Sequence, residues 1–313
     1  MNGKRQRLIV GLGELLWDLL PGGKQLGGAP ANFAVMSARL GNHAVIASRI
    51  GQDVLGEDAL KYLSALPVDS SYLQTDTQYA TGSVSVALRD GQPEYNIHRP
   101  VAWDFLECTS EWIELAQQAD AVCFGTLAQR NAVSRKAIGE FLDATSRNCV
   151  RVFDVNLRKP FFNADVLADS LTKTSLLKLN DAEMPVVLSL LGLTQHSGAD
   201  ERSLLAGARL LLARFPLQLI CITMGSHGSL LVTRDAHDRH RGLPVKVVDT
   251  VGAGDAFTAA LVHFFLQGAP LPVLNEAGNR WGAWVASQPG AMPALPVEVH
   301  NEIEAKIKEA VES

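Results

Sequence analysis

Residues 249–257 combine a glycine-rich turn with a carboxylate, and read Asp-Thr-Val-Gly-Ala-Gly-Asp-Ala-Phe. A short apolar run at 245–248 precedes them and predicts a strand, whereas 256–266 is apolar, lacks Pro and Gly, and predicts a helix. The Gly-Ala-Gly turn leaves backbone N–H groups uncovered at the start of that helix. Because unpaired donors coincide there with the positive end of the helix dipole, the turn is predicted to bind an anion.

Asp255 lies in the first turn of this predicted helix, beside the position of a bound anion. A carboxylate next to a phosphate raises the energy unless a hydroxyl lies between them and gives up its proton. Transfer of a phosphoryl group from a nucleotide to an alcohol fits that arrangement. The simpler interpretation is that Asp249, Thr250 and Asp255 cap a helix, since Asp, Thr and Gly favour such positions.

The same residues resemble the C-terminal signature of the PfkB (ribokinase-like) family of carbohydrate kinases, whose core is Asp-Thr-x-Gly-Ala-Gly-Asp. The resemblance implies that Asp255 is the general base. It also implies that the backbone amides of Gly252, Ala253 and Gly254 hold the transferring phosphoryl group.

A second glycine-rich segment, Gly-Gly-Ala-Pro-Ala-Asn-Phe-Ala at 27–34, resembles the N-terminal PfkB signature Gly-Gly-x-x-x-Asn-x-Ala. Gly27 and Gly28 allow the backbone to approach a polyhydroxyl ligand closely, and Asn32 offers both a donor and an acceptor to a sugar diol. Asp18, further upstream, can accept two hydroxyl protons. By itself the segment is compatible with a plain loop before a helix. Together with residues 249–257 it predicts a sugar site.

Residues 81–88 alternate small polar with apolar side chains, Asp90-Gly91 predicts a hairpin turn, and 93–98 returns. Alternation indicates a sheet with one face in water. We therefore predict a small antiparallel lid formed by about 15–20 and 72–98, which the family resemblance implies closes over the sugar.

Arg99 opens the stretch Arg-Pro-Val-Ala-Trp-Asp at 99–104, which resembles fructokinase-like members of the family. The resemblance implies that this arginine reaches the sugar or its neighbours. The alternative is an arginine exposed to solvent.

The rest of the chain alternates predicted strands with predicted helices, which indicates a mostly parallel sheet covered on both faces. The predicted strands are 8–14, 44–50, 121–125, 150–154, 176–179, 219–224 and 229–233. The segment 27–34 leads into a predicted helix through Leu40, and the other predicted helices are 55–65, 132–146, 182–191 and 201–215. Ligands of such sheets bind outside the carboxyl ends of the strands.

Polar motifs follow several of those strands. Arg158 ends an Asp-x-Asn-x-Arg element at 154–158, where it is expected to neutralise charge on the phosphoryl group. The family resemblance implies that Asn180 and Glu183, as Asn-x-x-Glu, organise Mg²⁺ mostly through water, which suits a metal that keeps several waters. An ordinary helix cap explains the same pair.

The nucleotide phosphates are expected beside a Thr-x-Gly-x-x-Gly turn with Thr223, Gly225 and Gly228, for which a plain hairpin is the alternative. Asn279 is a further residue that the resemblance assigns to ATP binding. Main-chain carbonyls of Asp249 and Val251, with the loop 286–291, are the candidate ligands of a K⁺ ion that the resemblance implies.

Composition narrows the function classes. A net charge of −5 argues against nucleic acid as a partner. No apolar run is long enough to span a bilayer, and an uninterrupted signal-peptide core is missing. Cys123, Cys149 and Cys221 lie in or beside apolar runs without metal-type spacing, as expected of buried thiols in a cytoplasmic protein. The sequence 237–240, His-Asp-Arg-His, has a metal-like spacing but is expected to be a solvated loop.

These features predict a single ribokinase-like α/β domain over 1–313 that transfers a phosphoryl group from ATP, with Mg²⁺, to a sugar. Fructose is the expected acceptor; ribose, 2-keto-3-deoxygluconate or a nucleoside are alternatives, and so are a sugar sensor of the same fold and a hydroxymethylpyrimidine-type kinase. We also expect a cytoplasmic homodimer that pairs through 15–20 and 81–98. The lid's apolar side, with Val84, Val86 and Leu88, needs cover from the cleft or from another chain.

Overall fold

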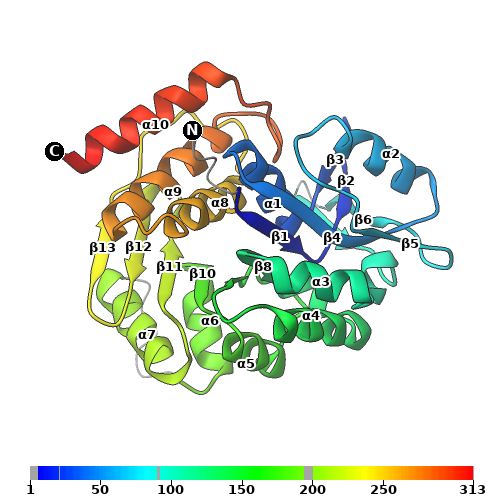
Figure 1. Cartoon of the computed structure of the whole chain (residues 1–313), viewed down its shortest axis with the longest axis horizontal. Coiled ribbons are helices and arrows are strands. Elements are labelled where there is room, and N and C mark those ends of the chain that lie inside the picture. The colour runs from blue at the N-terminus through cyan, green and yellow to red at the C-terminus, as the bar shows by residue number, and fades with distance from the viewer. Residues whose placement is uncertain (1–5, 21, 90–91, 194–199, 313) are drawn as a thin grey trace.

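A nine-stranded sheet organises the molecule (Figure 1), and the computed structural model describes residues 6–20, 22–89, 92–193 and 200–312, with backbone alone for 86–89, 92–95 and 311–312. Seven neighbouring strands are mutually parallel, and β12 and β13 add antiparallel strands at one edge. In spatial order the strands are β13 (His237–His240), β12 (Ser229–Val232), β11 (Leu219–Thr223), β10 (Leu176–Asn180), β9 (Val150–Asp154), β8 (Ala121–Gly125), β1 (Leu8–Leu12), β4 (His43–Gly51) and β5 (Leu73–Asp76).

Helices cover both faces of this sheet. One layer comprises α1 (Ala29–Arg39), α8 (Ala253–Phe265) and α9 (Leu271–Ala286), with α10 (Val297–Glu312) packed on α9. The opposite layer comprises α3 (Ser110–Gln118), α4 (Ala132–Ala144), α5 (Ala164–Thr172), α6 (Glu183–Leu190) and α7 (Glu201–Arg214). Strands buried on both faces carry near-continuous apolar runs, as β8 and β11 do, because neither side meets water. The predicted doubly covered α/β sheet is confirmed.

A separate four-stranded sheet forms the lid, on the right of Figure 1. Its order is β3 (Gly23–Gly27), β2 (Leu16–Leu20), β6 (Gly82–Arg89) and β7 (Gln92–Ile97). The β2–β3 and β6–β7 pairings are antiparallel, whereas β2 and β6 are parallel. The predicted turn at Asp90-Gly91 lies outside the described residues. Helix α2 (Val54–Leu63) packs beside the lid, where Trp17 donates its indole N–H to the carbonyl of Leu55 at 2.8 Å.

Three local predictions are wrong. Residues 73–76 form β5 at the edge of the main sheet and pair with β4, so this part of the predicted lid belongs elsewhere. The sequence 237–240 is strand β13, which pairs with β12, and is no solvated loop. The run at 245–248 forms no strand, because it pairs with no strand in the described part of the chain. Val247 and Val248 are 56% and 57% exposed, and the N–H of Val248 bonds to the carbonyl of Ala286 at the end of α9.

At Val84, the lid's apolar face is covered by its own chain. Val84 is 5% exposed and packs in the cluster that contains Leu16 and Trp103. Val84 therefore needs no second chain to shield it, as in the alternative of cover from the same chain, and the dimer stays a prediction. The side chains of Val86 and Leu88 lie outside the described residues.

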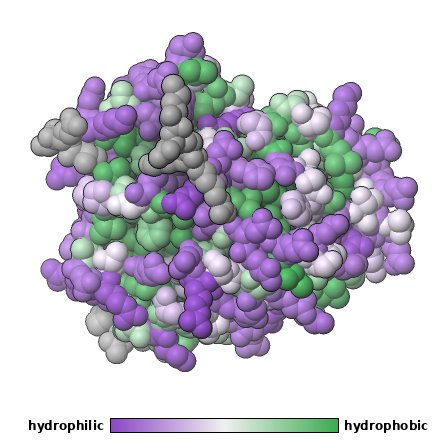
Figure 2. All heavy atoms as spheres, in the orientation of Figure 1, coloured by the Kyte–Doolittle hydropathy of each residue, from purple (hydrophilic) through white to green (hydrophobic). Residues whose placement is uncertain are grey.

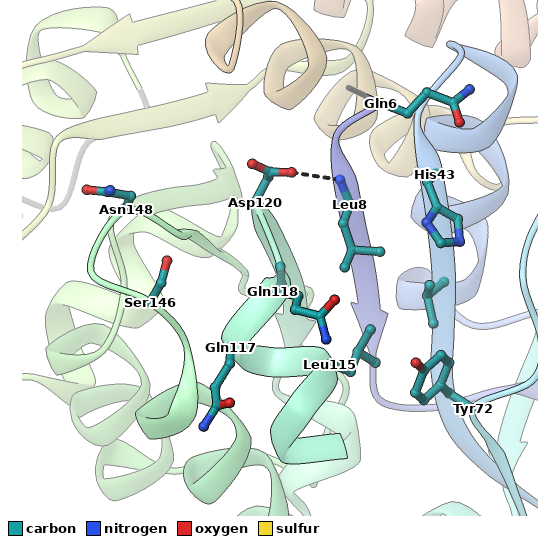
Figure 3. Close-up of a pocket in the computed structure, with 12 residues that line it drawn as sticks. Gln6, Leu8, His43, Tyr72, Leu115, Gln117, Gln118, Asp120, Ser146 and Asn148 are labelled. Atoms are coloured by element: carbon teal, nitrogen blue, oxygen red, sulfur yellow. Dashed lines mark hydrogen bonds between the residues drawn. The ribbon is translucent and has the colours of Figure 1, made fainter. Parts of the chain in front are cut away.

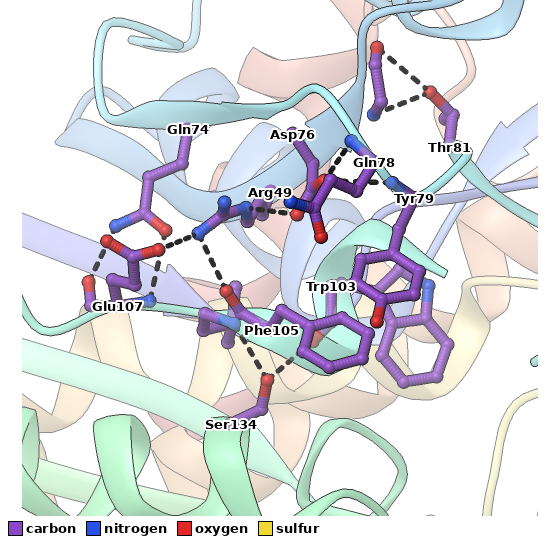
Figure 4. A network of polar contacts seen from close by, with 12 residues as sticks. Arg49, Gln74, Asp76, Gln78, Tyr79, Thr81, Trp103, Phe105, Glu107 and Ser134 are labelled. Atoms are coloured by element: carbon purple, nitrogen blue, oxygen red, sulfur yellow. Dashed lines mark hydrogen bonds and ion pairs between the residues drawn. The ribbon is translucent and has the colours of Figure 1, made fainter. Parts of the chain in front are cut away.

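A polar network fastens the segment that leads from β5 to the lid (Figure 4). Arg49 on β4 pairs with Asp76 at 2.8 Å and with Glu107 at 2.6 Å, and donates to the carbonyl of Phe105 at 2.8 Å. Asp76 in turn accepts from the backbone N–H groups of residues 78 and 79. This part of the chain is thus anchored to the main sheet, which gives the lid a fixed base.

Hydrophilic residues cover most of the face seen in Figure 2, and apolar residues form separate smaller areas on it. Among the described residues, no helix is long and apolar enough to cross a membrane. Cys123, Cys149 and Cys221 are buried free thiols, as predicted. Residues of α8 and α9 form a hydrophobic cluster against the sheet, the α8–α9 cluster. Trp281 is buried in it and Trp284 packs against it, so both belong to the core.

Candidate active site

The turn before α8, which contains Gly252, Ala253 and Gly254 and which we call the anion turn, has the form of an anion site. Gly252 adopts the left-handed conformation, with φ 78°, and a Cβ there would lie 2.7 Å from the Cα of Ala291, so only glycine fits. Asp249 holds the turn in place, since its carboxylate accepts from the N–H of Val251 at 3.0 Å and from that of Gly290 at 3.2 Å. No side chain caps the helix N-terminus, although the N–H of Ala253 bonds to the carbonyl of Thr250 at 3.2 Å.

Asp255 lies half-buried in the first turn of α8 and accepts a 2.8 Å hydrogen bond from the side-chain amide of Asn32 on α1. Burial, reinforced by the negative charge of Asp154, raises the pKa of Asp255 to about 6; Lys178, Asn32 and Arg158 act in the opposite direction. A carboxylate with that pKa is ionised at neutral pH, and it is a stronger base than an ordinary aspartate.

The lid brings the predicted sugar residues to the same place. A Cβ at Gly27 would lie 3.2 Å from Oδ2 of Asp18, and one at Gly28, with φ 111°, would meet the carbonyl oxygen of Glu14 at 2.3 Å. Burial raises the pKa of the Asp18 carboxyl. The charge of Arg158 lowers this pKa and the charge of Asp249 raises it, so Asp18 interacts electrostatically with the anion turn. Asn32 connects the group to Asp255, and its Oδ1 is a buried acceptor without a partner among the described residues.

Arg99 is exposed at the end of β7, with its guanidinium 5.5 Å from the centre of the Phe161 ring. It lines a cavity of about 560 Å³ together with Ser83, Ile97 and Phe161. The neighbouring Arg130 is held differently, in an ion pair with Asp104 at 2.7 Å. The structure therefore places Arg99 at the lid edge and supplies no contact that joins it to Asp18 or Asn32 among the described residues.

Arg158 is exposed beyond the end of β9, and its charge acts on Asp18 and Asp255. Asn156, two residues earlier, has a φ of 39°, which is uncommon for a residue other than glycine and marks a constrained bend here. The bend follows strand β9 directly, at the edge where ligands of parallel sheets bind.

Asn180 and Glu183 form a reciprocal cap at the start of α6. Asn180 accepts from the N–H of Glu183 at 2.8 Å, and Glu183 accepts from the N–H groups of Asn180 at 2.9 Å and of Leu157 at 2.7 Å. Burial raises the pKa of Glu183. The capping arrangement predicted as an alternative is thus present, and each carboxylate oxygen still has a lone pair for a metal-bound water.

The Thr-x-Gly-x-x-Gly segment forms the hairpin between β11 and β12, with a short 3₁₀ helix, η3 (Gly225–His227), at its tip. Gly225 faces open space, whereas a Cβ at Gly228 would meet the carbonyl oxygen of His240 at 2.1 Å. Thr223 ends β11. Asn279 is buried in α9, where its amide donates to the hydroxyl of Ser229 at 2.7 Å, so its donor group serves the packing of α9 on β12.

Glu14 was missed by the sequence reasoning, although it ends the predicted first strand. It is 2% exposed, and its Oε2 has no hydrogen-bond partner among the described residues. Burial raises the pKa of Glu14 to about 7, and the charge of Asp255 contributes to the rise. The buried ion pair of Asp154 with Lys178 was also missed. The sequence feature that could have indicated it is a lysine within an apolar strand.

We expect Glu14→Gln to stabilise the protein at alkaline pH. The pKa of Glu14 is higher in the folded protein than in the unfolded chain. The folded state therefore loses stability as pH rises from the pKa of the unfolded chain to that of the folded protein. Between pH 5 and pH 8 the variant should gain about 2–3 kcal/mol relative to the wild type. Urea unfolding at the two pH values measures this gain, and an equal difference between the proteins at both would contradict it.

A cavity of about 710 Å³, larger than the one beside Arg99, lies at the other end of the strands (Figure 3). It is lined by Leu8, His43, Tyr72 and Asp120 among others, and Asp120 accepts a 2.8 Å bond from the N–H of Leu8. These residues lie at the amino ends of β1, β4 and β8, whereas the ligands of parallel sheets bind at the carboxyl ends. Size alone therefore does not mark the active site here.

A parallel sheet with a lid, and an anion turn beside a half-buried carboxylate, define a kinase of the ribokinase-like fold. Residues 22–298 match the family model described as pfkB family carbohydrate kinase. The chain is 30% identical over 317 residues to fructokinase-1 of Oryza sativa subsp. japonica, covering 94% of this chain and 96% of the relative. It is 28% identical over 324 residues to probable fructokinase-2 of Arabidopsis thaliana, covering 95% of each.

Solved structures agree with this assignment. An uncharacterized sugar kinase from Pyrococcus horikoshii matches with a TM-score of 0.81 and 26% identity, over 98% of this chain and 100% of that one. The ATP-bound fructokinase of Xylella fastidiosa has the same fold, with a TM-score of 0.81 at 22% identity, over 96% of this chain and 99% of that one. The chain belongs to the pfkB family of carbohydrate kinases. It is an ATP-dependent sugar kinase.

Proposed function

We propose that this kinase phosphorylates fructose, with Asp255 as the general base. The observation that carries the proposal is the bond from Asn32 to Asp255, which joins the sugar-side residues of the lid and α1 to the anion turn. A sugar hydroxyl placed between them loses its proton to Asp255 while its oxygen bonds to the γ-phosphorus of ATP. The bond from that phosphorus to the bridging oxygen breaks, and ADP leaves.

The anion turn holds the phosphoryl group in this proposal. The amides of Gly252, Ala253 and Gly254 supply donors, that of Ala253 after it leaves its 3.2 Å bond to the carbonyl of Thr250, and Arg158 supplies positive charge. The hairpin glycines Gly225 and Gly228, with Thr223, lie by the nucleotide phosphates. Asn279 shapes the nucleotide site through its packing on β12.

Mg²⁺ bound together with ATP would neutralise charge on the phosphates. The chain fits a metal bound mainly by water and phosphate, because the described residues contain no cluster of three or more His, Cys, Asp or Glu side chains that would hold an ion alone. Asn180 and Glu183 provide the outer contacts of its water shell. The cytoplasm, where ATP is abundant, is the compartment that this activity implies.

On the sugar side, Asp18, Asn32 and the Gly27-Gly28 backbone bind hydroxyl groups. Asn32 has an unpartnered buried Oδ1, and a ligand hydroxyl can donate to it. Arg99 contributes from the lid edge once the lid closes. Fructose is favoured among acceptors because relatives with similarity along nearly the whole chain carry the name fructokinase.

A coupled assay of ADP release over a panel of sugars and nucleosides tests the proposal. We expect the highest kcat/KM with fructose, and lower values with ribose, 2-keto-3-deoxygluconate and nucleosides. A higher value with another acceptor would overturn fructose and leave the kinase class intact. Sugar binding without sugar-dependent ADP release would instead support a sensor.

A monovalent ion is the next part of the proposal. The residues 249–251 lie against the loop 286–291, as the Gly290–Asp249 bond and the closeness of Gly252 to Ala291 indicate. Carbonyls of Asp249, Val251 and this loop would hold K⁺, and the bound ion would order the anion turn. Replacing K⁺ by tetramethylammonium is then expected to lower kcat, measured at constant ionic strength. Rates that do not respond to the exchange would remove the site from the proposal.

We further propose a homodimer that pairs through the lid. Its support is the sheet itself, since β3 and β7 are edge strands and an open edge favours pairing with another chain. Light scattering is expected to give the mass of a dimer at micromolar concentration. Backbone amides of the edge strand β7, within 81–98, should also exchange hydrogen more slowly at high protein concentration than at low. A monomer under these conditions would contradict the dimer.

A further inference from the structure

A buried ion pair lies beneath the anion turn. Lys178 on β10 and Asp154 at the end of β9 are register partners, and the ammonium Nζ lies 3.1 Å and 3.0 Å from the two carboxylate oxygens. The two residues are only 9% and 3% exposed. Leu176 and Val152, two positions earlier, pack in the α8–α9 cluster, so the ion pair faces α8 as well.

The lysine reaches the start of α8. A Cβ at Gly254 would lie 3.0 Å from Nζ of Lys178, so the absence of a side chain in the turn lets the ammonium approach the helix backbone. A positive charge at this point adds to that of the helix dipole, where an anion binds.

Stability alone does not account for the pair. The other fully buried positions of β9 and β10 are apolar, and a buried ion pair contributes little net stability because desolvation of both charges offsets their attraction. Apolar residues of similar volume would pack at least as well. A charged pair at this position therefore points to the chemistry of the site above it.

We propose that Asp154 and Lys178 tune the site from beneath: Asp154 strengthens Asp255 as a base, and Lys178 supplies fixed positive charge to the anion turn. The inference rests on the proposed role of Asp255. Both are positioning residues, since they lie behind the turn and act on the reaction through it.

The charges around Asp255 support this division of roles. After burial, Asp154 is the largest influence that raises the pKa of Asp255, and Lys178, Asn32 and Arg158 lower it. Glu14 also faces Asp255 and interacts with its charge. Burial lowers the pKa of Lys178, but Asp154 and Asp255 outweigh burial and raise it, so the ammonium stays charged at every working pH.

Two variants separate the effects of Asp154 and Lys178. The quantity compared is the midpoint of the acid limb of the kcat–pH profile, measured at saturating ATP, Mg²⁺ and sugar. Asp154→Asn removes the negative charge and keeps the lysine, so the midpoint should fall by about one pH unit. Adding Lys178→Met removes the positive charge, so the midpoint should rise again, to between those of the single variant and the wild type. The plateau kcat of the double variant should also fall, though by less than the roughly 10²–10³-fold loss of a direct oxyanion donor.

Damage to the fold would lower kcat without moving the two midpoints in opposite directions. An unmoved or higher midpoint for Asp154→Asn, or equal midpoints for the two variants, overturns the inference. If the single variant does not unfold cooperatively, the double variant is compared with the wild type, because it leaves neither charge unpaired. An unchanged midpoint and an unchanged plateau kcat then overturn the inference. Asp255→Asn is assayed alongside, and only its activity decides whether Asp255 is the base.

Discussion

Asp255→Asn is expected to lower kcat by about 10²–10⁴-fold, because the side chain keeps its size and loses the proton acceptor. The affinities for sugar and ATP should change little, since an asparagine still fits beside Asn32 on α1. Initial rates of ADP release with saturating substrates measure the effect, and calorimetry measures the affinities.

Asp235→Asn is the matched control, since Asp235 is an exposed carboxylate in the turn between β12 and β13. Its kcat should equal that of the wild type. If Asp255→Asn turned over within a few-fold of the control, Asp255 would not be the base, and another group would have to take the hydroxyl proton.

Asp18→Ala is expected to raise the KM for the sugar by about 5- to 150-fold, which corresponds to the roughly 1–3 kcal/mol lost when a buried polar group of the ligand is left unpaired. The KM for ATP should change far less, because Asp18 lies on β2 of the lid, whereas the hairpin expected beside the nucleotide phosphates joins β11 and β12 of the main sheet. Steady-state kinetics with each substrate varied in turn separates the two constants.

Asp235→Ala serves as the control for this second change, with both constants expected at wild-type values. A proportionate rise of both KM values in Asp18→Ala would place Asp18 outside the sugar site. The result would then reflect a lid that no longer folds rather than a lost hydroxyl contact.

Most of the central sheet could be predicted from the sequence because its strands are short apolar runs bounded by turns. Such runs occur wherever helices cover both faces, as at β8 and β11. The two glycine-rich signatures could also be predicted to meet, since both were assigned to the same reaction. The bond from Asn32 to Asp255 places them in contact.

Strands at the edges could not be predicted in the same way. β13, His-Asp-Arg-His, carries polar side chains because it is an edge strand, and its strand character comes from pairing with β12. The opposite error arose at 245–248, where three valines suggest a strand but no partner is within reach. Strand propensity depends on neighbours, which the local sequence does not show.

Pairs of buried charges were hidden for a similar reason. Asp154 belonged to a recognisable element, but Lys178 stood alone in an apolar run, and nothing in the local sequence shows that parallel pairing of β9 with β10 joins them. Glu14 likewise looked like the polar end of a strand. Its burial depends on the close packing of Gly28 against its own backbone, a contact between separate elements.

Mass spectrometry of the products formed from ATP and fructose measures the central claim most directly. A kinase of this description should convert fructose to a fructose monophosphate in equal amount to the ADP released, and Asp255→Asn should form neither at a comparable rate. ADP without a phosphorylated sugar, or no product from any sugar of the panel in the presence of Mg²⁺ and K⁺, would contradict the claim.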